Sequence, residues 1–343
     1  MPTLSAARLH ELATRIFAAL GTPEDDARWI ATLLVRANLR GHDSHGVIRI
    51  PQYVISVRRG HTNPRPAITV ALDTPTTAVV DGDLGFGQVV ARRATEVALE
   101  KAAGHGLAGV GVQRSNHVGR LADYTELAAE RGFVAMMWVN ATTAVSVVPS
   151  GGIGRRLSTN PLAVAVPGPD GGVAVSVDMA TSIVAEGKVR VKRNRKEPLP
   201  EDWAIDAQGR PVTDSAAFYG PSRAGLLPMA GHKGTALALA VEVMAGILSG
   251  AGAIGPTPGP VLNGAFLLLV EVARFLPLAD FTKQVTDLVA WVKSSQPAPG
   301  VGDVMVPGEP EARMARERGT HGIPVEDETW RQIEEIAAEL EVG

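Results

Sequence analysis

The spacing of apolar residues changes along this chain of 343 residues, and this change constrains the fold more than any other feature of the sequence. Residues 5–20 and 22–41 repeat apolar side chains at helical spacing, as does the terminal stretch "VEDETWRQIEEIAAELEV". Between them, strand-like runs such as "FVAMMWV" and "AFLLLVEV" alternate with helical ones. The sequence therefore predicts an α/β or α+β fold, with a mixed sheet in the middle and helical segments at both ends.

Three glycines, Gly104, Gly106 and Gly109, match the G-x-G-x-x-G pattern of dinucleotide-binding Rossmann domains. In a Rossmann unit this pattern follows a strand and opens a helix, so that the pyrophosphate meets free N–H groups at the helix start. Here the pattern follows a helical run, residues 88–103, and precedes the strand-like "AGVGVQ". The reversed order predicts instead that Gly104 caps a helix and that the other two glycines form a turn.

The composition excludes several kinds of chemistry. The chain has no cysteine, which excludes disulfides, cysteine-ligated metals and thiol nucleophiles. Its formal net charge of -3, without a stripe of lysine and arginine, argues against nucleic acid as a partner. The sequence has no basic and apolar leader and no uninterrupted apolar run of membrane-spanning length. We expect a cytoplasmic protein, with no membrane partner, that acts on a small molecule and needs a bound cofactor for any redox reaction.

The segment "RGHDSHGVIRIPQY" gathers several side chains that bind anions or transfer protons. A helix beginning near Ser44 would place His45, Arg49 and Tyr53 on one face, because they are spaced four residues apart. A guanidinium there can hold a carboxylate through two parallel hydrogen bonds, and an imidazole one turn away can exchange a proton with a neighbouring oxygen. A solvated helix face is one alternative. Another pairs His42 with His45 as metal ligands, although no third ligand stands at a characteristic spacing.

Other polar residues stand at the expected ends of strands or the starts of helices. Asn116 and His117 follow the strand-like "LAGVGVQ", and Asp178 ends the strand-like "VAVSVD". Side chains at such strand ends tend to line the crevice of an α/β sheet. Lys233 lies in "GHKG" before a long helical run, where glycine flexibility and positive charge suit a phosphate group. The alternative for His117 is a loop histidine bonded to the backbone, and the alternative for the segment that begins at Asp178 is a simple helix cap.

In their order along the chain, these segments resemble the malate/L-lactate dehydrogenase family, NAD(P)-dependent oxidoreductases that lack a Rossmann fold. The segments that carry the resemblance include "RGHDSHGVIRIPQYV", "RSNHVG", "STNPLAVAVP", "VDMATS", "GHKG" and "WVKSSQPAPGVGDVMVPGEPE". The resemblance covers almost the whole chain. It implies an α/β cofactor-binding domain over residues 71–274, with a mixed sheet and a non-Rossmann dinucleotide site. It also implies a helical domain built from both chain ends, residues 1–70 and 275–343, and a homodimer with the site near the subunit interface.

The same resemblance implies roles for individual residues. His45 or His117 would exchange the proton with the substrate oxygen, and Arg49 would hold the substrate carboxylate. The residues implied in substrate binding are Ser44, Tyr53, Asn116 and Asn160. The residues implied in binding NAD or NADP are Asp178, Met179, Ala180, Lys233, Gly234, Gly308 and Glu309. No metal site is implied.

Several functions remain open at this point. The first hypothesis is an NAD(P)-dependent dehydrogenase that interconverts a small 2-hydroxy acid and its 2-oxo acid. The second is an NADPH-dependent reductase of a cyclic imine acid such as piperideine-2-carboxylate, because a carboxylate beside C=N presents the same geometry as one beside C=O. A metal-dependent hydrolase using His42 and His45, and a non-catalytic binding protein, belong to other classes. The basic run "KVRVKRNRK" could reach the 2′-phosphate of NADP or simply form a solvated face.

Overall fold

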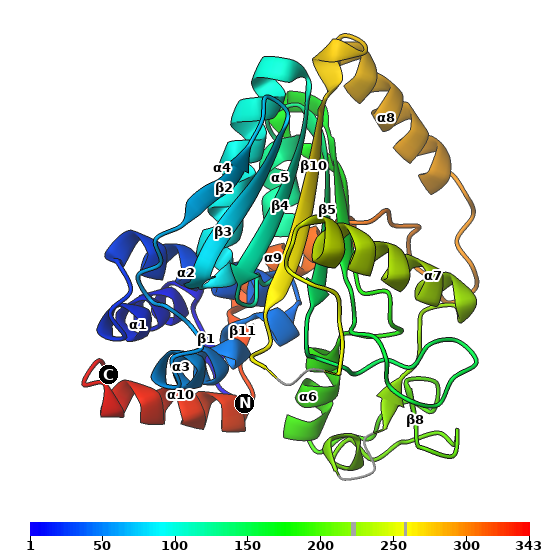
Figure 1. Ribbon diagram of the computed structural model, residues 1–343. Helices are drawn as coiled ribbons and strands as arrows, with labels where there is room; N and C mark the ends of the chain where they lie inside the picture. Colours follow the sequence, from blue (N-terminus) through cyan, green and yellow to red (C-terminus); the bar gives the residue numbers. More distant parts are fainter. Residues whose placement is uncertain (221–223, 257–258) are drawn as a thin grey trace.

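The computed structural model describes residues 1–220, 224–256 and 259–343, and its centre is a seven-stranded mixed sheet (Figure 1). In sheet order, the strands are β2 (Thr69–Asp73), β3 (Thr77–Gly85), β4 (Leu107–Ser115), β10 (Asn263–Glu271), β5 (Phe133–Ala141), β6 (Leu162–Pro167) and β7 (Val173–Met179). The β3–β4 pair is parallel and the other neighbouring pairs are antiparallel. The predicted α/β fold with a mixed sheet is confirmed.

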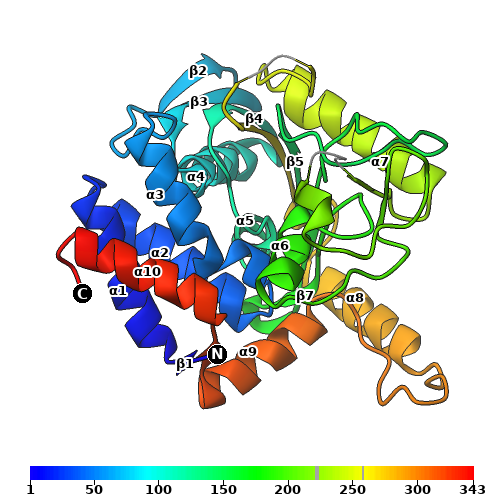
Figure 2. The same cartoon turned by 90° about the horizontal axis from the view of Figure 1, so that it is seen from below.

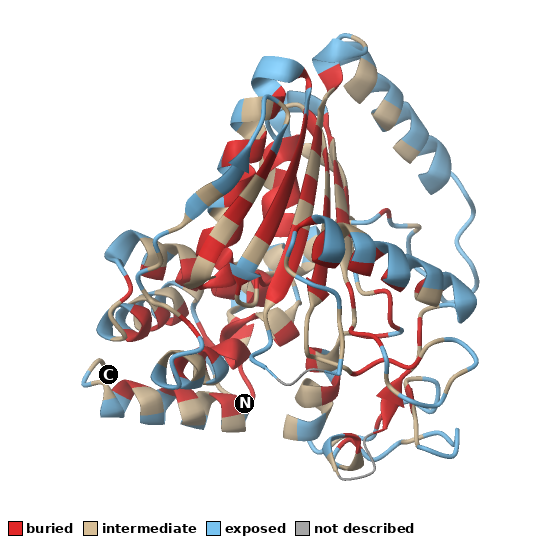
Figure 3. Cartoon of the chain, viewed as in Figure 1, coloured by how far each residue is buried: buried red, intermediate tan, exposed pale blue. Residues whose placement is uncertain are grey.

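Helices cover both faces of this sheet. The α-helices of the described residues are α1 (Ala6–Ala19), α2 (Glu24–Leu39), α3 (Ile50–Arg58), α4 (Gly87–His105), α5 (Ala122–Ala129), α6 (Glu186–Asn194), α7 (His232–Val241), α8 (Leu278–Lys293), α9 (Glu309–His321) and α10 (Asp327–Glu339). In Figure 1, α4 and α5 lie behind the sheet, and α7 lies in front. A π-helical turn, Glu242–Leu248, continues α7 and packs on β5 and β10. Buried side chains of the strands, α4 and α5 form one apolar core. In Figure 3, where buried residues are red, much of these strands is red.

The two chain ends lie together beneath the sheet (Figure 2). Strand β1 (Thr3–Leu4) pairs with β11 (Ile323–Pro324), and α10 contacts α1 and α3. Side chains of α1, α2, α3 and α10 form a second core. Helix α9 contacts α2, whereas α8 contacts β7 and the turn Pro169–Gly171 and otherwise extends away from the molecule. A separate small sheet, β8 (Ala204–Ile205) with β9 (Gly225–Leu226), lies near α6.

The prediction of one helix beginning near Ser44 is wrong. The chain instead makes two 3₁₀ turns, Asp43–His45 and Val47–Arg49, before α3 begins at Ile50. Between the turns, Gly46 is extended, with φ −87° and ψ −152°. The Asn38 side chain occupies the space beside it: its Oδ1 accepts a hydrogen bond from the Val47 N–H at 2.8 Å and would lie 2.1 Å from a Cβ at Gly46. This side-chain bond replaces a helical backbone bond and breaks the helix.

The reversed glycine pattern lies where its context predicts, between a helix and a strand. Helix α4 extends to His105, so Gly104 is its penultimate residue and not its cap, as the sequence suggested. The cap is Gly106, which adopts a left-handed conformation with φ 83°. Strand β4 begins at the next residue. The pattern therefore ends a helix and does not open one.

Candidate active site

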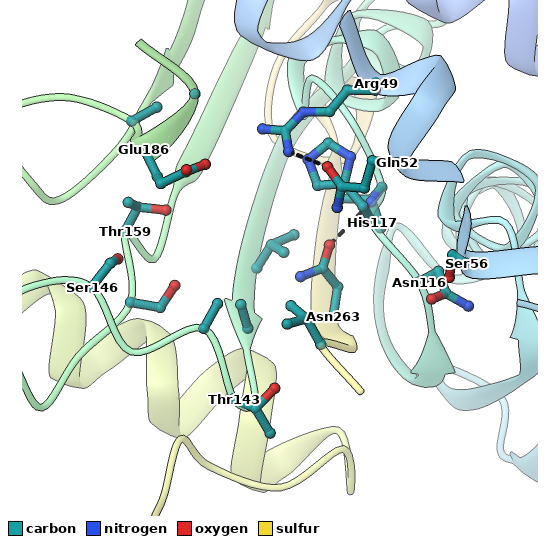
Figure 4. Close-up of a pocket in the computed structure, with 18 of the residues that line it drawn as sticks. Arg49, Gln52, Ser56, Asn116, His117, Thr143, Ser146, Thr159, Glu186 and Asn263 are labelled. Carbon is teal, nitrogen blue, oxygen red and sulfur yellow. Dashed lines mark hydrogen bonds between the residues drawn. The ribbon is translucent and has the colours of Figure 1, made fainter. Parts of the chain in front are cut away.

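A cavity of about 690 Å³ lies between the lower end of the sheet and the helices of the N-terminal part (Figure 4). Of the residues expected at the substrate, His45, Arg49, Tyr53, Asn116 and His117 line it. They come from two distant parts of the chain: the segment around the 3₁₀ turns and α3, and the loop that follows β4. The structure thus brings together the two polar clusters on which the sequence analysis placed the chemistry.

The two histidine rings lie nearly parallel, with their centroids 5.4 Å apart and an angle of 19° between their planes. A hydrogen bond fixes the orientation of the His117 ring, because its Nδ1 lies 2.6 Å from the Tyr53 hydroxyl. Gln88, at the start of α4, donates its side-chain N–H to the same hydroxyl at 2.7 Å. The hydroxyl hydrogen of Tyr53 is then free to point at His117 Nδ1, so the neutral His117 ring carries its proton on Nε2.

His45 is held by its neighbour Ser44, whose Oγ lies 3.0 Å from His45 Nδ1. Ser44 is buried behind the ring and does not line the cavity. Burial, with a further effect of the Arg49 cation, lowers the pKa of both His45 and His117 well below the usual histidine value. Both rings are therefore neutral at neutral pH.

Arg49 is a buried cation without a carboxylate partner among the described residues. Its Nε donates to the Ser44 carbonyl at 2.7 Å, and its Nη1 donates to the Gln52 side-chain oxygen, also at 2.7 Å. Both acceptors are neutral. Burial, followed by the nearby Arg190 cation, lowers the pKa of Arg49. Because a buried charge is costly unless it is paired, this guanidinium is a ready site for a carboxylate.

The opposite wall carries an ionic cluster that the sequence analysis did not identify. The Tyr219 hydroxyl donates to Glu186 Oε1 at 2.5 Å, and Arg190 Nη2 lies 3.2 Å from Glu186 Oε2. Arg190 Nη1 also donates to the Gln52 oxygen at 3.2 Å, which links this wall to Arg49. Arg190 belongs to the basic run in which we considered a 2′-phosphate site, but it lines this cavity. No sequence pattern marked Gln52, Glu186 or Tyr219.

The two expected asparagines differ in position. Asn116 lines the cavity and donates its amide N–H to the Leu84 carbonyl at 2.7 Å. Asn160 is fully buried and does not line the cavity. Its amide donates to the Ala238 carbonyl at 3.0 Å and to Glu242 Oε1 at 2.8 Å. Its side chain therefore joins the sheet to α7 and its continuation.

The segments expected to bind the cofactor are residues 178–180, 233–234 and 308–309. They do not line this cavity, but they come together at β7. The Thr181 carbonyl accepts a hydrogen bond from the Met229 N–H at 2.9 Å, just before α7. Gly234 permits this approach, because a Cβ there would lie 2.5 Å from the Thr181 carbonyl oxygen. On the other side, the Ser176 N–H donates to the Pro307 carbonyl at 3.0 Å. A Cβ on Gly308 would lie 3.1 Å from the Ser176 Cβ.

The side chains of these segments point in different directions. Asp178 faces α5, where its Oδ2 accepts a hydrogen bond from the Ala122 N–H at 2.9 Å. Met179 and Lys233 are exposed, and Ala180 is half-buried. Glu309 forms an ion pair with Lys293 at the end of α8. Lys233 and the first residues of α7 therefore offer positive charge and a helix start beside the end of β7.

The two histidines of the possible metal pair have different partners. His42 Nε2 lies 3.4 Å from Glu311 Oε1, on α9, whereas His45 lies against Ser44 and His117. Within the described ranges, no group of three or more His, Asp or Glu side chains is arranged to hold a metal ion.

A membrane span is also absent from the part of the chain that the structure describes, where no helix combines the length and the apolar character that crossing a bilayer requires.

Comparisons with known proteins agree with this architecture. Residues 4–334 match the family model for malate/L-lactate dehydrogenase. The chain is 38% identical to an L-lactate dehydrogenase of Cupriavidus necator, covering 99% of this chain and 98% of that protein. The crystal structure of malate dehydrogenase from Entamoeba histolytica superimposes with a TM-score of 0.94 at 28% identity, over 100% of this chain and 99% of that one. A Δ1-piperideine-2-carboxylate reductase from Pseudomonas syringae gives 0.84 at 28% identity, over 98% and 100%. The chain belongs to the malate/L-lactate dehydrogenase family, and it is an enzyme of the hydroxy acid dehydrogenase type.

Proposed function

We propose that this enzyme uses NAD or NADP to interconvert a small 2-hydroxy acid and its 2-oxo acid. The observation that carries the proposal is Arg49, a buried guanidinium whose hydrogen-bond partners among the described residues are neutral, in one cavity with two neutral imidazoles. A 2-oxo acid has a carboxylate beside a carbonyl, so it needs one fixed cation and one proton donor close together. Arg49 supplies the cation, and His45 or His117 supplies the proton.

The nicotinamide of the cofactor delivers or accepts the hydride at the substrate carbon. The residues that would hold the dinucleotide are those that meet at β7: Asp178 to Ala180, Lys233 with Gly234, and Gly308 with Glu309. The fit rests on the exposed lysine at the start of α7, since a helix start and a lysine side chain both suit a pyrophosphate.

Replacing Lys233 by Ala should weaken cofactor binding, measured by titration of NADH and NADPH fluorescence quenching. Lys283→Ala is the matched control, because Lys283 is exposed on α8 and pairs with Asp287 alone among the described carboxylates. Equal cofactor affinity in both variants would remove Lys233 from the proposed site.

The substrate carboxylate also affects the proton donor. Without an anion, burial and Arg49 keep the pKa of both histidines low. A carboxylate bound to Arg49 offsets that cation and raises the pKa of the neighbouring imidazole, so substrate binding favours proton uptake. Reduction consumes a proton and should therefore favour lower pH than oxidation.

The two histidines can be distinguished by His45→Asn and His117→Asn. General acid/base catalysis contributes about 10²–10⁴-fold to the rate, and the residue that transfers the proton should show a loss in kcat of that size. Its limb in the pH–rate profile should disappear as well. The other histidine, if it only hydrogen-bonds the substrate, should change KM more than kcat. Nearly normal kcat and pH profiles in both variants would contradict the proton-transfer role.

A second candidate is reduction of a cyclic imine acid with NADPH. It is favoured by the structural similarity to a protein named Δ1-piperideine-2-carboxylate reductase. A panel of 2-oxo acids and cyclic imine acids, each with NADH and NADPH and followed at the nicotinamide absorbance, decides between the two. The ratio of kcat/KM for the two nucleotides also gives the cofactor preference.

We also propose a homodimer, supported by exposed apolar side chains on two helices, α7 with its continuation and α8, which Figure 3 shows as largely exposed. The exposed apolar side chains are Leu239, Val243, Ile247 and Leu248 on α7 and its continuation, and Leu288, Trp291 and Val292 on α8. Ile247 is 60% exposed and Trp291 77% exposed, which is costly for large apolar groups in a monomer. Sedimentation should give a dimer for the wild type and for Lys283→Glu, and a shift toward monomer for Trp291→Glu or Ile247→Glu.

A further inference from the structure

Arg49, where the substrate carboxylate is proposed to bind, shares its cavity with four other charged side chains of the described residues: Arg59, Arg155, Glu186 and Arg190. The charges that act most strongly on Arg49 are those of Arg190 and Glu186. Arg59 lines the same cavity but follows the end of α3, about 15 Å along the helix axis from Arg49 at 1.5 Å per residue. Arg155 also lines the cavity, where its guanidinium lies 4.9 Å from the centroid of the Phe218 ring and donates to the Phe218 carbonyl.

The carboxylate of Glu186 is fixed in place. Tyr219 and Arg190 both donate to it, and Figure 4 shows it on the wall opposite Arg49 and directed into the cavity. The next residue, Gly187, presses against the Arg49 side of the site: a Cβ there would lie 2.5 Å from the Ser44 Cβ. A larger residue at 187 would push Glu186 away, so glycine is what permits the close approach.

Glu186 is also charged under assay conditions. Burial alone would raise its pKa, but the guanidiniums of Arg190 and Arg49 and the hydrogen bond from Tyr219 hold the pKa of Glu186 below the usual glutamate value. Among the described residues, the charged groups that act most strongly on Arg49 are the guanidinium of Arg190 and the carboxylate of Glu186, and these two are paired with each other, so Arg49 keeps a positive charge that neither offsets in full. One substrate carboxylate neutralises this charge. A second carboxylate directed toward Glu186 would meet a negative charge, and Arg190, the cation that pairs with Glu186, is already occupied.

We propose that Glu186 determines substrate specificity by restricting the enzyme to 2-hydroxy and 2-oxo acids with a single carboxylate, and by rejecting dicarboxylates of the malate type. This inference rests on the proposed function and names the substrate class of the same site. Glu186 acts both by repelling a second carboxylate and by occupying Arg190, the cation that would otherwise bind it.

The size of the effect follows from Coulomb's law. Two like charges about 6 Å apart, at an effective dielectric constant of about 20, repel strongly enough to change binding roughly 100-fold. Partial screening by Arg190 reduces this, so we expect a discrimination of roughly 10–100-fold in kcat/KM.

The experiment compares racemic malate, a dianion, with its monoanionic isostere 2-hydroxysuccinamate, in which a neutral amide replaces the second carboxylate. Lactate serves as a small monocarboxylate, and oxidation is followed at the nicotinamide absorbance with NAD and NADP. The wild type should prefer the amide to malate by at least about tenfold. Glu186→Gln should raise the malate-to-amide ratio of kcat/KM by roughly 10–100-fold, whereas Glu186→Asp should retain the wild-type preference. Glu197→Gln is the control, because it removes a charge that pairs with Lys192, away from the cavity, and it should leave the ratio unchanged.

Each outcome has a definite meaning. A wild-type enzyme that oxidises malate at least as well as the amide overturns the inference and leaves the proposed function intact, and this comparison needs no variant to fold. An unchanged ratio in Glu186→Gln also overturns it, as does an equal change in Glu197→Gln. If the wild type oxidises none of the three acids with either nucleotide, and reduces no 2-oxo acid, both proposals are wrong.

Discussion

Replacing Tyr53 by Phe tests how His117 is positioned, because it removes one hydroxyl that has two partners. That hydroxyl lies 2.6 Å from His117 Nδ1 and accepts the Gln88 amide N–H at 2.7 Å. Burial raises the pKa of Tyr53 to about 12, so the group stays protonated in any ordinary assay and produces no limb of its own in a pH profile. The substitution keeps the ring and its contacts with Phe17 and Phe86.

The loss in stability can be worked out from the hydrogen bonds. Gln88 is fully buried, and its side-chain oxygen already has no partner, so the variant leaves its whole amide unpaired. An unsatisfied buried polar group costs about 1–3 kcal/mol. His117 also loses the contact that fixes its tautomer and ring orientation, and misplacement of a reacting group by about 1 Å can cost on the order of 10²-fold in rate. We expect a fall in kcat of roughly 10–100-fold, with a small effect on cofactor affinity.

Tyr124→Phe is the matched control. Tyr124 is also buried and donates to the Val118 carbonyl at 2.5 Å, but it has no hydrogen bond or ring contact with His45 or His117 and does not line the cavity. It should lose a similar free energy of unfolding in urea and keep nearly normal kcat. If Tyr53→Phe retained wild-type kcat and an unaltered pH profile, or if Tyr124→Phe lost as much activity, the argument that Tyr53 positions His117 would be refuted.

Three further perturbations follow from the same geometry. Arg49→Lys keeps the positive charge but loses the planar guanidinium that can bind a carboxylate through two hydrogen bonds. Because a lost hydrogen bond to a charged group costs about 1.5–3 kcal/mol, KM for the acid should rise roughly 10–100-fold in steady-state kinetics. The Kd for NAD(P)H should barely change. Gly187→Ala places a Cβ 2.5 Å from the Ser44 Cβ and 3.1 Å from Arg49 Nη2. The variant should therefore lower the free energy of unfolding by about 1–3 kcal/mol and raise KM for the acid. Normal values of both quantities would contradict the close packing of residue 187 against Ser44 and Arg49. Because burial, followed by Arg49, lowers the pKa of His45 and His117 in the folded state, their contribution to stability is present above the unfolded value of about 6.5 and is lost as pH falls through and below it. Urea unfolding of the double Asn variant should therefore depend less on pH between 7 and 5 than that of the wild type, and an equal dependence would contradict these shifts.

The spacing of apolar residues and the order of helical and strand-like runs along the chain predicted the fold class, because both can be read from local sequence. The β6–β7 hairpin follows from alternating apolar residues on either side of "GPDGG", and the two form an antiparallel pair. The reversed glycine pattern could be rejected as a Rossmann site for the same reason. The helix expected from Ser44 failed because the side chain of Asn38, near the end of α2, accepts a hydrogen bond from the Val47 N–H in place of a helical carbonyl. The spacing of residues along the chain does not reveal this competing side-chain hydrogen bond.

The candidate site was predicted only where its residues stand in a recognisable segment. His45, Arg49 and Tyr53 lie in one short stretch, and His117 lies directly after a strand, so both groups could be identified. Glu186 had no such signal. Its proposed role depends on Tyr219, Arg190 and Arg49 meeting across the cavity, and this meeting is produced by tertiary packing of α6 against the first 3₁₀ turn, Asp43–His45. A charged residue at the start of a basic helix is more often a solvated cap.

The parallel unit β3–α4–β4 explains why a strand–helix–strand crossover here does not hold a dinucleotide at its helix start. A Cβ on Gly87, the first residue of α4, would lie 2.3 Å from the Asn116 carbonyl oxygen and 2.4 Å from the His117 carbonyl carbon. The backbone after β4 therefore lies directly against the helix start and leaves no space for a phosphate at that point. The same contact brings Gln88 to Tyr53 and so orients His117. The crossover therefore positions the His117 side chain, one of the two candidates for proton transfer. The proposed dinucleotide has to bind away from the start of α4, and we place it where the segments 178–180, 229–234 and 307–309 meet at β7.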